Sequence, residues 1–498
     1  MPNVPSIRIR PRNNAAIRAQ GDFVLYWMIA ARRVQWNFAL QHAAELAAGL
    51  HKPLVILEPL ACSYPWASDR LHRFVLDGMA CNASRIASHG KALYYPYLEP
   101  AAGAGKGMLE ALSTRACAVV TDDFPAFFLP RMVDAVAPRL SVRLEQVDSN
   151  GILPMRAAPE AFTTAHSFRR FLQKNLARHL SAFPASDPLR AVSLPKPPPL
   201  PKDFTRRWPA CDPDRLAGDI HALDNLPIDH DVGAVEAQGG AEAAQSRLDA
   251  FVRSGLHRYV EYHNAPDEDA TSQLSPHLHF GHISAHQIFD AVARVEGWTE
   301  ERLGQATDGK REGWWGMSAD AESFLDQLVT WRELGFNMCW HRPDYDRYES
   351  LPAWARQTLA IHAVDPRARC YELEAFENAA THDPVWNAAQ RQLRREGRIH
   401  NYLRMLWGKK ILEWSTTPQK ALECMLALND KWALDGRDPN SYNGIFWVLG
   451  RYDRAWGPER RIFGKIRYMS SENTARKLAI EGYMNKYGDG TWRSRDEL

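Results

Sequence analysis

The sequence predicts a chain of two unlike parts: a doubly wound, Rossmann-like α/β domain at residues 20–150 and an all-α domain at residues 206–498. Three observations lead to this prediction. At 498 residues the chain is too long for one typical hydrophobic core. Short apolar runs alternate with amphipathic stretches in the N-terminal part, as strands and helices do in a parallel sheet. In the C-terminal part, apolar residues recur at helical spacing without a convincing strand.

Five short apolar runs are the predicted strands of the N-terminal domain. They are Phe23–Met28, Pro53–Glu58, Ala92–Pro96, Cys117–Thr121 and Val142–Val147. Between the first two runs, Asn37–Leu50 has the pattern of a helix. The domain lacks a GxGxxG sequence, so a dinucleotide-binding fingerprint is not indicated there.

Residues 151–205 are predicted to connect the two domains. Their segment Ser193–Phe204, SLPKPPPLPKDF, is rich enough in proline to form a stiff, extended linker. We expect this linker to run over the surface between the domains.

The composition is that of an ordinary globular protein, with 45% hydrophobic and 24% charged residues. A net charge of +2 does not by itself indicate a polyanionic partner, although a basic groove is compatible with it. The seven cysteines are scattered without a CxxC pair, which favours reduced thiols and no metal site. Because neither a signal peptide nor a membrane span is found, we expect a cytoplasmic protein.

Hydroxyl residues gather before a predicted helix in the segment Tyr259–Ser284. Thr271, Ser272 and Ser275 lie at or just before the start of that helix. Free backbone N–H groups and hydroxyls at such a place can hold a phosphate. Ordinary N-capping by the same hydroxyls is the alternative interpretation.

Several motifs of this chain occur together, in this order, in one family. They are LVTWRELGFN (328–337), THDPVWNAAQ (381–390), RIHNYLRMLWGKKILEW (398–414), LNDKWALDGRDPNSYNGIFW (428–447) and FGKIRYMS (463–470). The sequence resembles class II cyclobutane pyrimidine dimer photolyases of the photolyase/cryptochrome superfamily. The N-terminal half agrees through VLYWM, VQWNFAL, VTDDFP and VDSNGILP. This resemblance implies the photolyase fold, an α/β antenna-type domain followed by an all-α FAD-binding catalytic domain.

The resemblance implies FAD as the cofactor. The implied FAD-binding residues are Tyr259, Asn264, Thr271, Ser272, Gln273, Leu274, Ser275, Arg404, Asn429, Asp435 and Asn440. Asn429 matches the asparagine that faces flavin N5, and Arg404 and Asp435 match an ion pair beside the flavin ring. A structural salt bridge is compatible with the same pair. Asn440 lies in a DGRDPN sequence, where turn formation is the alternative. An antenna chromophore in the N-terminal domain, a deazaflavin or a folate, is a further expectation.

Three tryptophans are candidates for an electron relay. Trp407 and Trp414 are seven residues apart and therefore share one helix face at a distance of ~10 Å. Core packing alone explains such a pair. The resemblance adds Trp386, 21 residues before Trp407, and so implies the class II tryptophan relay that carries electrons from the surface to photoexcited flavin.

The implied activity is that of a deoxyribodipyrimidine photo-lyase, a carbon–carbon lyase. Electron transfer from excited reduced FAD repairs a cyclobutane dimer that is flipped out of UV-damaged double-stranded DNA. Trp331 and Trp447 match the aromatics that embrace the flipped dimer, and Asn401 and Met405 face the same site. We expect a monomer with no membrane partner. Basic residues that are candidates for phosphate contacts are Arg391, Arg394, Arg395, Arg398, Lys409, Lys410, Arg451, Arg454, Arg460, Arg461 and Lys465, with a solvated face as the alternative.

Two positions depart from the family pattern. Gln327 stands where a catalytic carboxylate is expected, and His263 stands where a basic residue is expected. The neighbouring Asp326 points about 100° away on a helix, so it substitutes only if the helix rotates. Two other functions stay open: a cryptochrome-like blue-light photoreceptor without repair, and repair of the (6-4) photoproduct, whose enzymes carry histidines at the positions of Asn401 and Met405.

Overall fold

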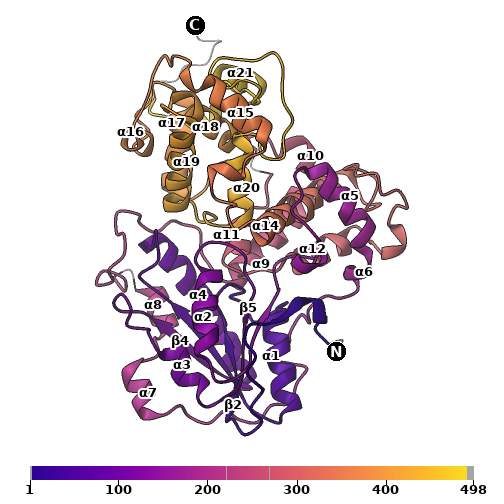
Figure 1. Ribbon diagram of the computed structural model, residues 1–498, viewed down its shortest axis with the longest axis vertical. Coiled ribbons are helices and arrows are strands. Elements are labelled where there is room, and N and C mark those ends of the chain that lie inside the picture. The colour runs from indigo at the N-terminus through magenta and orange to yellow at the C-terminus, as the bar shows by residue number, and fades with distance from the viewer. Residues whose placement is uncertain (1–2, 220, 269, 491–498) are drawn as a thin grey trace. The chain divides into compact units, whose positions relative to one another are not determined.

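The computed structural model describes residues 3–219, 221–268 and 270–490. The chain divides into two compact units, each assembled from separate segments (Figure 1). The first unit contains residues 1–159, 175–249 and 273–300, and the second contains residues 160–174, 250–272 and 301–498. The units therefore divide the chain differently from the predicted boundaries, because residues 206–249 and 273–300 belong with the sheet.

A six-stranded sheet in the order β1-β6-β5-β2-β3-β4 forms the centre of the first unit. Its strands are β1 (Ile9–Pro11), β2 (Phe23–Trp27), β3 (Leu54–Leu60), β4 (Ala92–Leu98), β5 (Ala116–Asp122) and β6 (Leu144–Val147). The edge strand β1 pairs antiparallel to β6, and the other neighbours pair parallel. The predicted α/β class is confirmed, and β1 is the strand that the sequence analysis did not predict.

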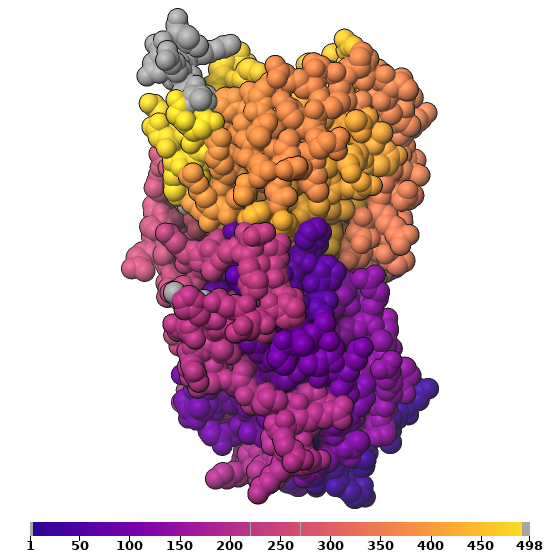
Figure 2. All heavy atoms as spheres, turned by 90° about the vertical axis from the view of Figure 1, so that its left-hand side faces the viewer, coloured from indigo at the N-terminus to yellow at the C-terminus, as the bar shows by residue number. Residues whose placement is uncertain are grey.

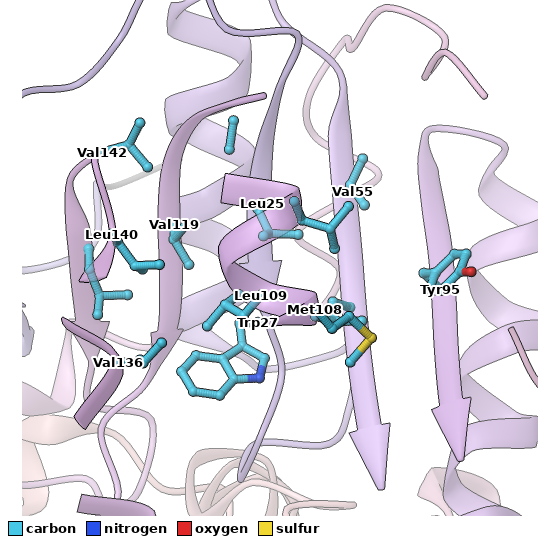
Figure 3. Packing of buried hydrophobic residues seen from close by; sticks show 14 of the residues in the cluster. Leu25, Trp27, Val55, Tyr95, Met108, Leu109, Val119, Val136, Leu140 and Val142 are labelled. Carbon is cyan, nitrogen blue, oxygen red and sulfur yellow. The ribbon is translucent and has the colours of Figure 1, made fainter. Parts of the chain in front are cut away.

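The interior of the first unit follows from the apolar runs of the strands. Every residue of β2 and β5 is buried, as expected for central parallel strands with both faces covered. Figure 3 shows the cluster on one face, where Leu25, Val55 and Val119 come from the strands and Met108 and Leu109 come from α3. The helices of this unit are α1 (Phe38–Gly49), α2 (Asp69–His89), α3 (Met108–Ser113), α4 (Leu129–Val136), α6 (Ala177–Leu180), α7 (Lys202–Arg207), α8 (Pro213–Gly218), α9 (Ala241–Ala250), α11 (Ser275–His279) and α12 (Ala285–Val295).

The proline-rich segment 193–204 lies within the first unit and does not run between the two units. Phe204, its last residue, and Trp208, which follows it, are buried in the cluster on one face of the sheet. The Trp208 indole N–H donates to the carbonyl of Ala104 at 2.9 Å. The unit's surface in Figure 2 includes residues of the stretch that follows, in magenta. Two aromatic anchors thus hold an extended segment that the sequence analysis interpreted as an inter-domain linker.

The second unit is helical. Among the described residues beyond β6, no strand occurs. The helices are α5 (Ala165–Asn175), α10 (Tyr259–Tyr262), α13 (Ala319–Leu325), α14 (Arg332–His341), α15 (Ala353–Ile361), α16 (Leu373–Glu377), α17 (Pro384–Glu396), α18 (Asn401–Trp414), α19 (Pro418–Trp432), α20 (Pro439–Val448), α21 (Ser471–Lys477) and α22 (Glu481–Tyr487), with single π-helical turns at η4 (Phe251–Gly255) and η7 (Asp326–Trp331).

Five helices of the second unit pack closely and position the candidate site. Helix α18 contacts α17, α19 and α20, and α14 packs against α20. Figure 1 shows α17, α18 and α19 side by side. The close approach of α14 to α20 depends on Gly335, since a Cβ there would lie 2.6 Å from the carbonyl oxygen of Pro439.

Candidate functional site

Asn429 is held by neighbours in a fixed orientation. Its side chain lies on α19 and is 4% exposed. The amide nitrogen Nδ2 donates to Ser441 Oγ at 2.9 Å and to Asp430 Oδ1 at 3.1 Å. Because a carboxylate only accepts, Asp430 fixes which end of the amide faces it. Within the described chain, Oδ1 of Asn429 makes no hydrogen bond, so it is available as an acceptor for a ligand N–H group.

Arg404 and Asp435 form the ion pair that the sequence analysis predicted. Arg404 on α18 reaches the loop after α19, and its Nη2 lies 3.0 Å from Asp435 Oδ1. Asn440 is exposed at the start of α20, where its backbone N–H donates to Asp438 Oδ1 at 2.8 Å. The Asp438 side chain caps that helix. The turn-forming interpretation therefore holds for this segment, and a role of the Asn440 side chain toward FAD stays a prediction.

Two further predicted FAD contacts of the second unit, Tyr259 and Asn264, are linked through His263. The His263 ring stacks on Tyr259, with centroids 4.8 Å apart. Its Nδ1 lies 2.6 Å from the carbonyl oxygen of Tyr259, and its Nε2 lies 2.9 Å from Asn264 Nδ2. In this pattern Nδ1 donates to the carbonyl of Tyr259 and Nε2 accepts from the Asn264 amide. Burial, and next the charge of Asp326, raise the pKa of the Tyr259 hydroxyl.

The predicted phosphate-binding segment spans the boundary of the two units. Thr271 and Ser272 belong to the second unit, and Gln273 to Ser275 belong to the first. Helix α11 begins at Ser275, and its N-cap residue is Leu274, without a side-chain capping bond. Arg247 donates to the Gln273 side chain, whose backbone φ is 53°. The N-cap position of α11 is therefore occupied by an apolar residue, and phosphate binding by this segment stays a prediction.

The three candidate relay tryptophans lie in contact. Trp386 of α17 stacks on Trp407 of α18, with centroids 6.5 Å apart and an interplanar angle of 4°. Its other neighbour is Trp414, at 6.0 Å in an edge-to-face arrangement. Trp386 is thus the middle member. Its indole N–H donates to the Trp407 carbonyl, and the Trp407 indole N–H donates to Gln390 Oε1, both at 2.9 Å.

The outer end of this tryptophan series is buried. The sequence analysis expects the relay to begin at the surface. Trp414 is only 4% exposed, so it does not itself reach the surface. Tyr371 and His382 contact its ring, with centroids at 5.8 Å and 5.0 Å. The Tyr371 hydroxyl lies 2.8 Å from His382 Nδ1, and His382 is exposed. These two residues connect Trp414 to solvent.

Gln327 and Trp331 lie in a widened helical turn. Residues 319–341 form one continuous helix whose middle, η7, is π-helical, and the Arg332 N–H donates to the Gln327 carbonyl five residues back. Such turns are rare and often occur at functional sites. Gln327 is exposed and Trp331 is half-buried, while the residues between them are buried.

Asp326 does not replace the missing carboxylate. Arg169 of α5 binds it bidentately, from Nε to Oδ1 at 2.7 Å and from Nη2 to Oδ2 at 3.0 Å. Asp326 is 6% exposed, whereas Gln327 is exposed. The rotation that would bring this carboxylate into the site is therefore not present in the structure.

Two basic side chains lie over the ring of Trp447 on α20. Lys409 Nζ is 4.9 Å from the centre of its ring, and Arg467 Cζ is 5.3 Å from it. Lys409 is fully buried, donates to the Val448 carbonyl at 2.5 Å, and has its pKa lowered to about 7 by burial. Arg467 is held by Asp453 at 3.1 Å. Cations over an indole face stabilise its position.

The packed helices bring most of the predicted site residues into one unit. Asn401 is exposed and Met405 half-buried on α18, the helix that also carries Arg404 and Trp407. Asn443 on α20 donates from Nδ2 to the Trp331 carbonyl at 3.1 Å, which links the two helices that carry Trp331 and Trp447. Three candidates for phosphate contacts are excluded by burial, namely Lys409, Lys410 and Arg451.

Sequence reasoning missed the residues that hold the others. These supporting residues are Arg169, Tyr371, His382, Gln390 and Ser441. His382, Gln390 and Ser441 lie inside the quoted motifs, so their place in the sequence was a usable signal. Arg169 lies far away in the sequence, and its pairing with Asp326 was not readable from either segment.

The arrangement of a parallel α/β unit and a helical unit defines a fold class. A bacterial class III photolyase from Agrobacterium tumefaciens matches the chain with a TM-score of 0.64 and 17% identity, over 94% of this chain and 86% of that one. The predicted photolyase fold is thereby confirmed. In the described residues, no helix is long and apolar enough to span a membrane.

Sequence comparison identifies the family. The DNA photolyase model matches residues 24–190. A deoxyribodipyrimidine photo-lyase of Methanothermobacter thermautotrophicus is 34% identical over 96% of this chain and 97% of its own length. One from Oryza sativa is also 34% identical, over 93% of this chain and 87% of its own length. The chain therefore belongs to the DNA photolyase family.

Proposed function

We propose that this protein is a deoxyribodipyrimidine photo-lyase that repairs cyclobutane pyrimidine dimers in UV-damaged double-stranded DNA by light-driven electron transfer. The similarity to enzymes of that name along nearly the whole chain supports the reaction class. The observation that carries the mechanism is the buried series Trp407, Trp386 and Trp414, whose neighbouring rings lie 6.0 and 6.5 Å apart.

FAD is the proposed cofactor, and the residues present fit it. Oδ1 of Asn429 offers a buried acceptor to a ring N–H group, and the Arg404–Asp435 ion pair supplies fixed charges on the neighbouring helix. Tyr259 and Asn264, ordered by His263, complete the set in the second unit. When bound and reduced, FAD supplies the light absorption and the electron for opening the dimer.

Residues of the protein supply the proposed route by which electrons reach this cofactor. Trp407 stands on α18 one turn beyond Arg404, so it is the relay member adjacent to the proposed flavin site. Trp386 and Trp414 continue the path outward. Tyr371, hydrogen-bonded to the exposed His382, can give up an electron at the outer end while the histidine accepts the phenolic proton.

Lesion recognition is assigned to two indole rings. Trp331 and Trp447 are both half-buried, so part of each indole is accessible to the two flipped pyrimidines of the dimer. Asn401 and Met405 lie one turn apart on α18 and are accessible as well. Gln327, exposed in the widened turn, offers an amide N–H to a dimer carbonyl and, unlike a carboxyl group, neither charge nor proton.

One experiment separates this function from its alternatives. Purified, chemically reduced protein is illuminated with duplexes that contain either a cyclobutane dimer or a (6-4) photoproduct, and loss of each lesion is measured. We expect only the cyclobutane dimer to disappear. Loss of the (6-4) photoproduct alone would reassign the substrate, and loss of neither from a reduced, DNA-bound protein would leave a photoreceptor function.

A second chromophore, the monomeric state and the cytoplasmic location stay predictions. The chromophore is tested by the absorption spectrum of protein purified from its natural host, after subtraction of FAD. The monomer is tested by the mass of the protein in solution.

A further inference from the structure

The widened turn η7 is held from outside by a segment far away in the sequence. Residues 160–174, here termed the strap, include most of α5 and belong to the second unit although sheet residues precede and follow them. The strap contacts the helix 319–341 on both sides of η7. This placement raises the question of what a distant segment contributes to the residues inside the turn.

On the N-terminal side of the turn, the tie is a buried ion pair. Arg169 binds both carboxylate oxygens of Asp326, the first residue of η7, and the two side chains are only 9% and 7% exposed. The remaining end of the guanidinium donates to the Gly309 carbonyl at 3.1 Å. Gln173, one turn further along α5, accepts from the Gly309 N–H at 2.7 Å and donates to the Lys310 carbonyl at 2.9 Å. These contacts with residues 309 and 310 restrain the Arg169 side chain independently of its ion pair with Asp326.

On the C-terminal side, the tie is an amide. Asn337 of α14 accepts from the backbone N–H of Phe162 and donates to the carbonyl of Glu160, both at 2.9 Å. The Trp331 carbonyl, at the end of η7, is held separately by Asn443, whose own Oδ1 accepts from the Tyr452 hydroxyl at 2.7 Å. The turn is thus held at its first residue, Asp326, at its last residue, Trp331, and beyond it at Asn337.

This restraint has a geometric consequence for the lesion site. A π turn contains one residue more than an α turn, so it rotates the residues that follow relative to those that precede it. With Asp326 drawn inward by Arg169, its neighbour Gln327 points outward, and Trp331 lies nearly one π turn further along on the same side. If the turn relaxed to regular α-helix, the direction of Trp331 would change by up to about 100° relative to Gln327 and the preceding segment.

We propose that Arg169 and Asp326 are positioning residues that hold the π turn and thereby direct Gln327 and Trp331 toward the lesion. The inference rests on the proposed function for the identity of the ligand, but the anchoring itself does not. Buried ion pairs contribute little net stability compared with an apolar pair of similar volume, and one use of such a pair is to select a single conformation. The strap would therefore supply specificity rather than stability.

The test replaces the pair by apolar residues of similar volume, Arg169→Met with Asp326→Leu. Removing both partners leaves no uncompensated buried charge, so the fold and FAD content should be retained. The control is Arg342→Met with Asp344→Leu, which removes another bidentate pair at the end of the same helix, away from the turn. Two quantities are measured, namely amide hydrogen exchange of peptides covering residues 326–331 and affinity for dimer-containing against undamaged duplex.

We expect faster exchange in the turn and a preference for dimer DNA that falls about 10- to 100-fold, the size of effect that a misplaced contact produces. The control variant should change neither. Unchanged exchange together with unchanged preference in the apolar variant would overturn the proposal. Should that variant not fold, Arg169→Lys, which keeps the charge but not the bidentate geometry, is compared by the same two measurements. A wild-type protein without preference for dimer DNA would contradict the proposed function, while the exchange result would still decide the anchoring.

Discussion

Single residues in this site are oriented by neighbours that form hydrogen bonds with one end of each side chain. The Asn429 amide nitrogen donates to Ser441 and Asp430, and its side-chain carbonyl oxygen stays available as an acceptor. His263 donates with one ring nitrogen and accepts with the other. Because these side chains are already oriented, less free energy is lost in ordering them when a ligand binds.

His263 illustrates how the structure changes the meaning of a departure from the family pattern. The family places a basic residue here, but arginine has only donors and cannot accept from Asn264 Nδ2. We therefore expect His263→Arg to lower the FAD content of purified protein, while His263→Gln, which keeps an acceptor, lowers it less. The flavin-to-protein absorbance ratio measures this. Equal FAD content in all three proteins would show that Asn264 needs no such partner.

At Gln327, exchange of the amide nitrogen for an oxygen tests the proposed repair reaction with the smallest change in the site. Gln327→Glu keeps size and shape, so folding and FAD content should be unchanged. The carboxyl group adds a charge-assisted hydrogen bond to the dimer, and we expect the repair yield per absorbed photon to change by a modest factor. Because glutamine has no titratable proton, the variant should show an additional dependence of repair on pH in the acid range that the wild type lacks. Dimer loss under identical light, with Gln327→Ala as the control that lacks both groups, measures the effect.

At the scale of elements, the tryptophan series depends on the packing of α17 against α18. The spacing of seven residues correctly suggested that Trp407 and Trp414 share a helix face. The order of the series was not readable from spacing, because Trp386 enters from another helix and its ring lies between the other two. Tertiary packing therefore determines the route, and sequence determines only its candidates.

The middle position of Trp386 leads to a prediction about photoreduction. Trp386→Phe should abolish or greatly slow light-driven reduction of oxidised FAD, because it interrupts the contact between Trp407 and Trp414. Repair by chemically reduced protein should persist, since it needs no external electron. Trp432→Phe on α19 is the matched control, because this indole is also buried but lies outside the series. Transient absorption after a laser flash measures both proteins, and normal photoreduction in Trp386→Phe would contradict the assigned order.

At the scale of the whole molecule, the sequence predicted the fold class and five of the strands, because their apolar runs are continuous and flanked by turn residues. It missed β1, whose three residues Ile9–Pro11 carry no run, and it missed that each unit is assembled from separate segments. No local pattern reports that residues 160–174 leave the sheet unit, since the interactions that take them there are long-range. The same limit hid the Arg169–Asp326 pair.

The stability of the first unit should depend on buried histidines. His72 and His277 are 0% and 3% exposed, and burial lowers the pKa of each to about 4. In the unfolded chain the pKa is ~6.5, so between about pH 6.5 and 4 the unfolded state binds more protons and stability falls as the pH falls. Above this window the contribution is complete, and below it these rings add no further dependence.

The magnitude of this effect makes it measurable. Each ring contributes up to about 3 kcal/mol across the window, since a tenfold difference in proton affinity corresponds to about 1.4 kcal/mol. We expect the urea midpoint to drop between pH 7 and pH 5 in the wild type, and His72→Gln to reduce that drop even if it lowers the midpoint at pH 7. The exposed His221→Gln is the control, because its ring is already solvated in the folded state. An identical pH dependence of unfolding in wild type and His72→Gln would mean that the buried ring takes up its proton without opening the fold.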